Sequence, residues 1–319
     1  MRTDLRRVPL AILLAIAMAT SAAAAPARAP SARRALLISV DGLRPDLMLR
    51  ANTPTLHDLM RQGSFSMWAR TTAVSITLPS HTSMLTGVPP ARHGIDWNRD
   101  LPFSEIVYPR VPTLFELAKK AGRTTAMVAG KKKFEALAKP GTLDWCFVPS
   151  VTVVSDEQVA DSAVAMIARH HPEVMFVHLP AVDTAGHEHG WGSAAQLAAI
   201  ETADRCISAI LGELRRQELL QATVVIVSSD HGGAGTEHGP DDPRSRTIPW
   251  LISGPGVRQG LDLTLDRDLV INTEDTFATI CYLTRIPLPE HIDGRPVLAA
   301  MDSSLADSPA GSPASATSH

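Results

Sequence analysis

Short apolar runs alternate along the chain with longer segments in which apolar residues recur every three or four positions. The runs have the length of strands, and the longer segments have the pattern of amphipathic helices. Strands are predicted over residues 35–40, 123–130, 174–179, 223–229 and 248–253, and helices near residues 53–63, 113–121, 156–170 and 273–283. A long helix capped by Ser193 is predicted from an apolar stripe of Leu197, Ile200, Ile207, Leu211 and Leu214. This alternation predicts an α/β fold, with a mostly parallel sheet and helices on both faces.

The two ends of the chain differ from this pattern. Residues 1–25 combine three arginines, a short apolar stretch and small residues, which is typical of a cleaved signal peptide and predicts a periplasmic or secreted protein. An uncleaved anchor is the alternative, but the apolar stretch is too short to predict a stable membrane span. Residues 26–34 are interpreted as a flexible leader and residues 302–319, rich in Ser, Ala and Pro, as a disordered tail. A single catalytic domain is expected over residues 35–301.

Composition narrows the function. The chain has 319 residues, 30 basic and 33 acidic side chains, and few aromatic residues, so no nucleic-acid-binding surface is evident. The length suits one large domain. The three cysteines, Cys146, Cys206 and Cys281, are too few and too widely spaced for a disulfide framework, although one bridge remains possible. The sequence leaves the oligomeric state open.

Five polar clusters follow apolar runs, where an α/β sheet collects its ligands at the carboxyl ends of its strands. They supply three aspartates, three histidines and one hydroxyl: Asp41, Thr77, Asp183, His187, Asp230, His231 and His238. Any one of them alone has an ordinary explanation, such as a turn aspartate or a helix cap. Together they predict a site with mixed oxygen and nitrogen ligands, which suits zinc better than calcium and is also compatible with manganese.

The hydroxyl of Thr77 is the candidate nucleophile. Pro79 favours a helix that begins at this point, and backbone N–H groups at a helix N-terminus favour a bound phosphate. The competing hydroxyls belong to Thr71, Thr72 and Ser75, whereas Ser80 and Thr82 lie inside the presumed helix. Six ligands and a hydroxyl match a site with two metal ions roughly 4 Å apart.

These motifs resemble the alkaline phosphatase superfamily, and within it the type I phosphodiesterase/nucleotide pyrophosphatase group. The resemblance covers about residues 35–298 and rests on SVDGLRPD, TLPSHTSMLTG, PARHGI, DTAGH and SDHGG, in that order. It implies an alkaline-phosphatase-like three-layer sandwich and a two-zinc phosphoesterase acting through a phosphothreonine intermediate. One zinc would be held by Asp41, Thr77, Asp230 and His231, and the other by Asp183, His187 and His238.

The resemblance also bears on the substrate, expected to be a small phosphate ester. Asn98 matches an asparagine that contacts a phosphate oxygen in the family. His238 follows His231 by only seven residues, whereas the nucleotide pyrophosphatases place their last histidine much later, and His291 is the other downstream candidate. Lys131 and Lys133 fall near a position where family members that prefer monoesters carry basic groups; a solvated lysine run is the alternative.

Two enzyme functions and one non-enzyme function therefore remain. The first is a phosphodiesterase or nucleotide pyrophosphatase, and the second is a phosphomonoesterase on the same site. A secreted metal- or phosphate-binding protein with the same fold would not need a positioned hydroxyl. A sulfatase is disfavoured because no cysteine lies in a C-x-P-x-R context.

Overall fold

The computed structural model describes residues 32–99 and 105–303. The predicted signal peptide lies outside the described residues, as do residues 26–31 of the predicted leader and 304–319 of the predicted tail. The leader is shorter than predicted, because Arg34 already belongs to a strand. Within the described part of the chain, no helix is long and apolar enough to cross a membrane. The three cysteines are free: Cys146 is exposed, and Cys206 and Cys281 are buried.

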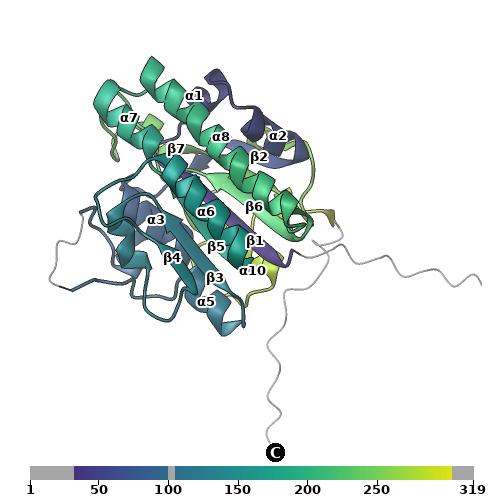
Figure 1. The fold of residues 1–319 in the computed structure, drawn as a ribbon. Coiled ribbons are helices and arrows are strands. Elements are labelled where there is room, and N and C mark those ends of the chain that lie inside the picture. Colours follow the sequence, from purple (N-terminus) through teal and green to yellow (C-terminus); the bar gives the residue numbers. More distant parts are fainter. Residues whose placement is uncertain (1–31, 100–104, 304–319) are drawn as a thin grey trace, which may run out of the picture.

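The centre of the molecule is an eight-stranded sheet with the order β4-β3-β5-β1-β6-β7-β2-β8 (Figure 1). The strands are β1 (Arg34–Val40), β2 (Gly63–Arg70), β3 (Thr125–Ala129), β4 (Trp145–Phe147), β5 (Val174–Leu179), β6 (Thr223–Ser228), β7 (Thr247–Ser253) and β8 (Leu261–Asp262). Neighbouring strands are parallel except at β7, which is antiparallel to both β6 and β2. The mostly parallel sheet predicted from the sequence is therefore confirmed.

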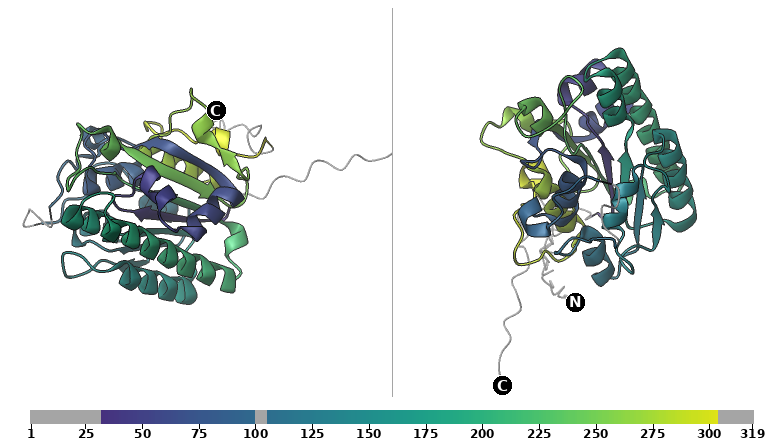
Figure 2. Two further views of the ribbon diagram at one scale, coloured as in Figure 1. Left: turned by 90° about the horizontal axis from the view of Figure 1, so that it is seen from above. Right: turned by 90° about the vertical axis from the view of Figure 1, so that its left-hand side faces the viewer.

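Helices cover both faces of the sheet (Figure 2). The helices are α1 (Pro45–Arg50), α2 (Pro54–Gln62), α3 (Thr77–Thr86), α4 (Pro90–His93), α5 (Leu114–Lys120), α6 (Asp156–His170), α7 (Ala181–His189), α8 (Ala194–Arg216), α9 (Pro243–Arg246) and α10 (Thr273–Thr284). Alternate residues of each central strand point to opposite faces, so β1 contributes Leu37 to the core under α3, α5 and α10, and Leu36 and Ile38 to the core under α1, α2, α6 and α8. Two buried cores on one sheet explain why most residues of the central strands are apolar on both faces.

Local sequence signals fix several helix boundaries. The Ser193 side chain accepts a hydrogen bond from the Gln196 N–H, which confirms the predicted cap of α8. Ser155 with Gln158, and Thr113 with Glu116, form capping boxes at the starts of α6 and α5. These caps satisfy N–H groups that would otherwise lack partners at the helix ends.

The sheet contains three strands that were not predicted from the sequence, β2 and the short strands β4 and β8. Strand β2 was not predicted, because its sequence GSFSMWAR has no regular alternation of apolar and polar residues. The ladder between β2 and β7 is also irregular, since Ser66 pairs with Trp250 but Ala69 pairs with Ile248. Two residues of β2, Met67 and Trp68, thus lie opposite the single residue Pro249, which forms a β-bulge. Pro249 cannot donate to the ladder, and bulges are among the few places where a sheet tolerates proline.

Candidate metal centre

The predicted site residues converge at the carboxyl edge of three adjacent strands. Asp41 follows β1, Asp230 and His231 follow β6, and α7 after β5 carries both Asp183 and His187. His238 lies in the loop after β6, and Thr77 is the first residue of α3. The fold therefore brings all seven predicted residues to one place, as expected for ligands beyond the carboxyl ends of parallel strands.

Gly42 allows this convergence between β1 and α7. Its backbone has a φ of +76°, a conformation that glycine adopts without strain. A Cβ atom at this position would lie 2.9 Å from the Cα of Asp183. A side chain here would push the Asp41 and Asp183 backbones apart.

One group of possible metal ligands contains Asp41, Asp230 and His231, which are completely buried. The Nε2 atom of His231 lies 3.3 Å from Asp41 Oδ1 and 3.2 Å from Asp230 Oδ2. Two ligand atoms of a tetrahedral zinc are separated by roughly 3.3 Å when each is about 2.0 Å from the metal. The hydroxyl of Thr77 lies 3.5 Å from the same His231 nitrogen.

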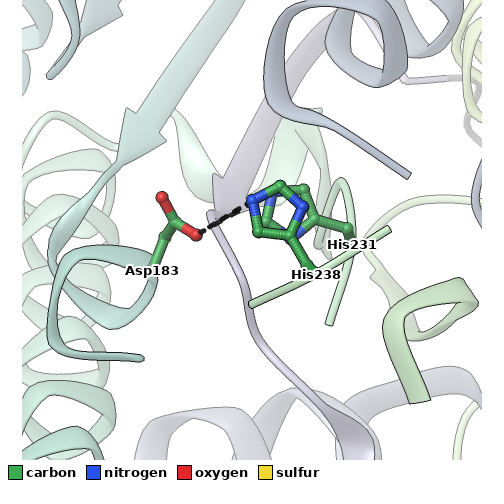
Figure 3. A group of neighbouring side chains, drawn as sticks. All are labelled: Asp183, His231 and His238. Carbon is green, nitrogen blue, oxygen red and sulfur yellow. Dashed lines mark ion pairs between the residues drawn. The ribbon is translucent and has the colours of Figure 1, made fainter. Parts of the chain in front are cut away.

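A second group contains Asp183, His231 and His238 (Figure 3). The Asp183 carboxylate faces the two imidazole rings, with Asp183 Oδ1 3.9 Å from Nε2 of each histidine. His187 Nε2 lies 3.4 Å from the same oxygen, at the more exposed rim. His231 thus stands between the two groups. His291, the other downstream histidine, belongs to neither group and contacts Arg92 through its carbonyl.

The carboxylates direct one oxygen each into this centre. Asp41 Oδ1, Asp183 Oδ1 and Asp230 Oδ2 are buried without a hydrogen-bond donor. Their partner oxygens are engaged: Asp41 Oδ2 and Asp183 Oδ2 with Lys131, and Asp230 Oδ1 with the Gly42 N–H. A buried carboxylate oxygen without a partner is costly. Three that point to one place fit a cation.

The histidines are held in the orientation that a metal ligand needs. The Nδ1 atoms of His231, His238 and His187 each lie 2.8 to 2.9 Å from a backbone carbonyl oxygen. An Nδ1–H group donates to that carbonyl, so the Nε2 lone pair is left facing the centre. Burial, and then the neighbouring His231, lower the pKa of His238 to about 4, so its ring is neutral at pH 7 and able to bind a metal.

The three carboxylates of the centre repel one another when they are ionised. Burial raises the pKa of Asp230, and the nearby Asp41 and Asp183 raise it further. Burial would also raise the pKa of Asp41, but Lys131, His178 and His231 outweigh that effect and hold it well below its ordinary value. The ammonium group of Lys131 contacts Asp41 and Asp183 and offsets part of this negative charge. A bound cation would stabilise the ionised form of all three carboxylates.

Lys131 enters the centre from the segment after β3. Its Nζ atom lies 2.6 Å from both Asp41 Oδ2 and Asp183 Oδ2, and the residue is 8% exposed. Burial would lower the pKa of Lys131, but Asp183 and Asp41 raise it, so the side chain stays charged. Lys131 therefore joins one carboxylate from each ligand group, while Lys133 lies further out, with Nζ 3.2 Å from Asn98 Oδ1.

Two buried histidines beneath the centre, His178 and His81, were not singled out from the sequence. The Gly130 N–H donates to His178 Nδ1, so Nε2 of His178 carries the proton and donates to Asp41 Oδ2 at 2.9 Å. His81 links the Thr77 carbonyl to the Ser39 hydroxyl on β1, with both distances 2.8 Å. His178 lies within the apolar strand β5, and His81 lies inside helix α3, so neither stands at the end of a strand where ligands are expected. The distance between them along the sequence also gives no indication of a shared site.

The contact between His178 and Asp41 predicts a measurable effect on metal binding. Replacing His178 with Phe removes the donor to Asp41 Oδ2, and metal affinity is expected to fall by about 10- to 100-fold, the usual cost of losing a group that orients a ligand. Calorimetric titration of the metal-free proteins with zinc measures the two affinities. An unchanged zinc affinity in a folded His178→Phe variant would contradict the positioning role.

Residues 35–245 match the sequence pattern of a family described as Type I phosphodiesterase / nucleotide pyrophosphatase. The chain belongs to this family. The family predicted from the sequence is thereby confirmed, and its members hydrolyse phosphate esters, the enzyme class that was also predicted. The alkaline-phosphatase-like sandwich is confirmed as well: the structure of human ectonucleotide pyrophosphatase / phosphodiesterase 5 superposes with a TM-score of 0.70 at 16% identity, over 85% of this chain and 100% of that chain.

Curated relatives come from two branches of the superfamily. The chain is 22% identical to the bis(5'-adenosyl)-triphosphatase enpp4 of Xenopus laevis over 218 residues, which is 64% of this chain and 48% of that protein. It is 33% identical to human arylsulfatase K over 100 residues, 30% of this chain and 18% of that protein. The chain thus spans less than half the length of these relatives. Family membership fixes the fold and the class of chemistry, and the substrate requires an argument from the site.

Proposed function

We propose that this member of the family is a secreted two-zinc phosphodiesterase that acts through Thr77. The observation that carries the proposal is the group of three unpaired, buried carboxylate oxygens that face the same space as the Nε2 atoms of His231 and His238. The Thr77 hydroxyl lies 3.5 Å from His231 at the edge of that space. A pure binding site would not need a hydroxyl at this point.

The ligands divide between two metal positions. Asp41, Asp230 and His231, with Thr77 beside them, would hold one zinc, and Asp183, His187 and His238 would hold the other. The distances of 3.2 to 3.9 Å among these donor atoms support this division. Mixed carboxylate and imidazole ligands favour zinc, and manganese is compatible with them. When bound, the metal ions would supply the positive charge that favours the ionised hydroxyl and a negatively charged leaving oxygen.

Thr77 is positioned to attack phosphorus. It is the first residue of α3, and its carbonyl is fixed by His81. The competing hydroxyls are occupied elsewhere: Ser80 contacts Thr71 and Thr72, and Thr82 donates to the Leu78 carbonyl. Thr77 would form a bond to phosphorus as the ester oxygen leaves, giving a phosphothreonine that water then hydrolyses.

Asn98 would steady the phosphoryl oxygens during both steps. Its Oδ1 accepts hydrogen bonds from the Leu78 N–H at 3.1 Å and from Lys133 Nζ at 3.2 Å. Because Oδ1 is occupied by two donors, the amide nitrogen is the group left to donate to a phosphate oxygen. The backbone N–H of Leu78, the residue after Thr77, therefore acts on the substrate indirectly, by orienting the Asn98 side chain.

A diester is the better substrate on electrostatic grounds. A monoester dianion carries one more charge than a diester, and the nearest ammonium, on Lys131, is already balanced by Asp41 and Asp183. The alternative is a phosphomonoesterase, in which Lys133 beside Asn98 would meet the additional charge.

Initial rates on two chromogenic esters separate these functions. The zinc-loaded protein is expected to hydrolyse bis-p-nitrophenyl phosphate faster than p-nitrophenyl phosphate, by about tenfold or more, since each 1.4 kcal/mol of differential stabilisation gives that factor. Faster turnover of the monoester would replace the diesterase proposal with the monoesterase. No metal-dependent turnover of either ester would reject both.

The similarity to arylsulfatase K does not favour a sulfatase. The proposed nucleophile is Thr77 and not a cysteine, and the cysteines lie in β4, α8 and α10, outside both ligand groups. The arginine-rich and apolar segment over residues 1–25 supports the proposed secreted or periplasmic location, which cell fractionation tests directly.

A further inference from the structure

We propose that a second cavity, next to the metal centre, binds an aromatic or strongly apolar anion. The cavity has a volume of about 590 Å³ and lies between α1, the end of β2 and the start of α9. Its lining includes the apolar side chains of Leu49, Met67 and Trp68, three arginines, Arg44, Arg70 and Arg244, and one carboxylate, Asp46. A volume of this size holds a small organic molecule.

The β-bulge in β2 explains why an aromatic ring lines this cavity. Because Met67 and Trp68 together face Pro249, the strand turns locally and Trp68 is directed outward. Trp68 is 73% exposed, and Leu49 beside it is 49% exposed. Large apolar side chains are rarely this accessible in a hollow unless something packs on them. A flat indole face accepts an aromatic ring or another planar apolar group.

The charges around the cavity select an anion. Arg44 forms two hydrogen bonds to Asp46, and Arg244 forms two to Asp242. Within residues 32–99 and 105–303, no carboxylate forms an ion pair with Arg70. Arg70 follows Trp68 by two positions on β2 and is exposed on the same face of the strand. An unpaired guanidinium next to an exposed indole fits a ligand that carries a carboxylate, sulfonate or phosphate on an aromatic body.

The cavity is separate from the metal centre, but two hydrogen bonds connect the two regions. Arg44 Nη1 donates to the Gly233 carbonyl at 3.0 Å, and the Gly232 N–H donates to the Ser245 carbonyl at 2.9 Å. Both contacts connect the rim of the cavity to the loop that carries His231 and His238. None of the proposed metal ligands lines the cavity.

Indole NMR signals can test the site with a probe that is not a phosphate ester. The chain has five tryptophans, and the Trp68→Phe variant identifies the Trp68 signal. Naphthalene-2-sulfonate is expected to shift the Trp68 signal saturably, whereas sodium sulfate and 2-naphthol at equal concentration shift it much less. Arg70→Gln is expected to raise the dissociation constant for naphthalene-2-sulfonate by about tenfold, because one charge-assisted contact is lost. Arg50→Gln, on an exposed arginine of α1 outside the cavity, is the matched control and should leave binding unchanged.

Three results would overturn the proposal. The first is the absence of a saturable Trp68 shift, and the second is equal affinity in the Arg70→Gln and Arg50→Gln variants. The third is a shift at Trp191, whose ring lies 5.2 Å from that of His187 at the metal centre, without one at Trp68. Because the measurement requires no turnover, its outcome does not depend on the proposed function.

Discussion

The Thr77→Ala variant is expected to lose hydrolysis by roughly 10³-fold or more while it keeps its metal content. The substitution removes the only hydroxyl of the segment that lies beside His231, and the loss of a covalent nucleophile leaves only the residual effect of binding and electrostatics. The ligand carboxylates and imidazoles are unchanged, so zinc should still bind. Steady-state rates and elemental analysis of the purified variant measure the two properties.

Two further variants control this experiment. Thr77→Ser keeps a hydroxyl and should keep measurable turnover. Thr82→Ala removes a hydroxyl one turn further along α3, where it donates only to the Leu78 carbonyl, and its rate should stay close to that of the unmodified protein. Turnover by Thr77→Ala at the unmodified rate would remove Thr77 from the mechanism.

The second large effect is expected from His231. Its Nε2 atom is within 3.9 Å of Asp41, Asp183 and Asp230, one oxygen of each, so His231→Ala disturbs both ligand groups. We expect zinc content to fall well below two equivalents per chain and hydrolysis to fall by roughly 10³-fold, the scale of losing a metal-dependent step. Chelation of the unmodified protein should have the same effect, and added zinc should reverse it.

Variants of the neighbouring histidines distinguish the two metal positions. His238→Ala and His187→Ala should lose mainly the second metal, so their zinc content should be about one equivalent if the proposed division holds. His291→Gln is the matched control, since His291 is exposed and outside both groups. Full zinc content and full activity in His231→Ala would contradict the proposed centre.

Much of the fold could be predicted because its signals are local. Buried strands such as β1 and β6 are mostly apolar, and α8 carries a regular apolar stripe behind the Ser193 cap. The carboxyl ends of such strands also have a known position, which is why Asp41 and Asp230 could be expected to meet. The direction of β7 and the existence of β2 depend on pairing between distant segments, and neither leaves a periodic pattern.

The contacts that tune the centre could not be predicted for the same reason. Lys131 appears in the sequence as one of three consecutive lysines, and only the packing of β3 beside β5 brings its ammonium between Asp41 and Asp183. His178 appears as a polar interruption in an apolar strand. The exposure of Trp68 results from a bulge that forms opposite Pro249 on another strand. Each depends on three-dimensional neighbours, not on spacing along the chain.

Acid quenching during turnover tests the central claim most directly. The zinc-loaded protein is mixed with excess bis-p-nitrophenyl phosphate, quenched in acid within the first turnovers, digested and analysed by mass spectrometry. The proposed mechanism predicts that one p-nitrophenolate leaves and that the peptide containing Thr77 carries the remaining p-nitrophenyl phosphoryl group, whereas the Thr77→Ala protein shows no such adduct. An active protein whose Thr77 peptide is never modified, or whose adduct lies on another residue, would contradict the account.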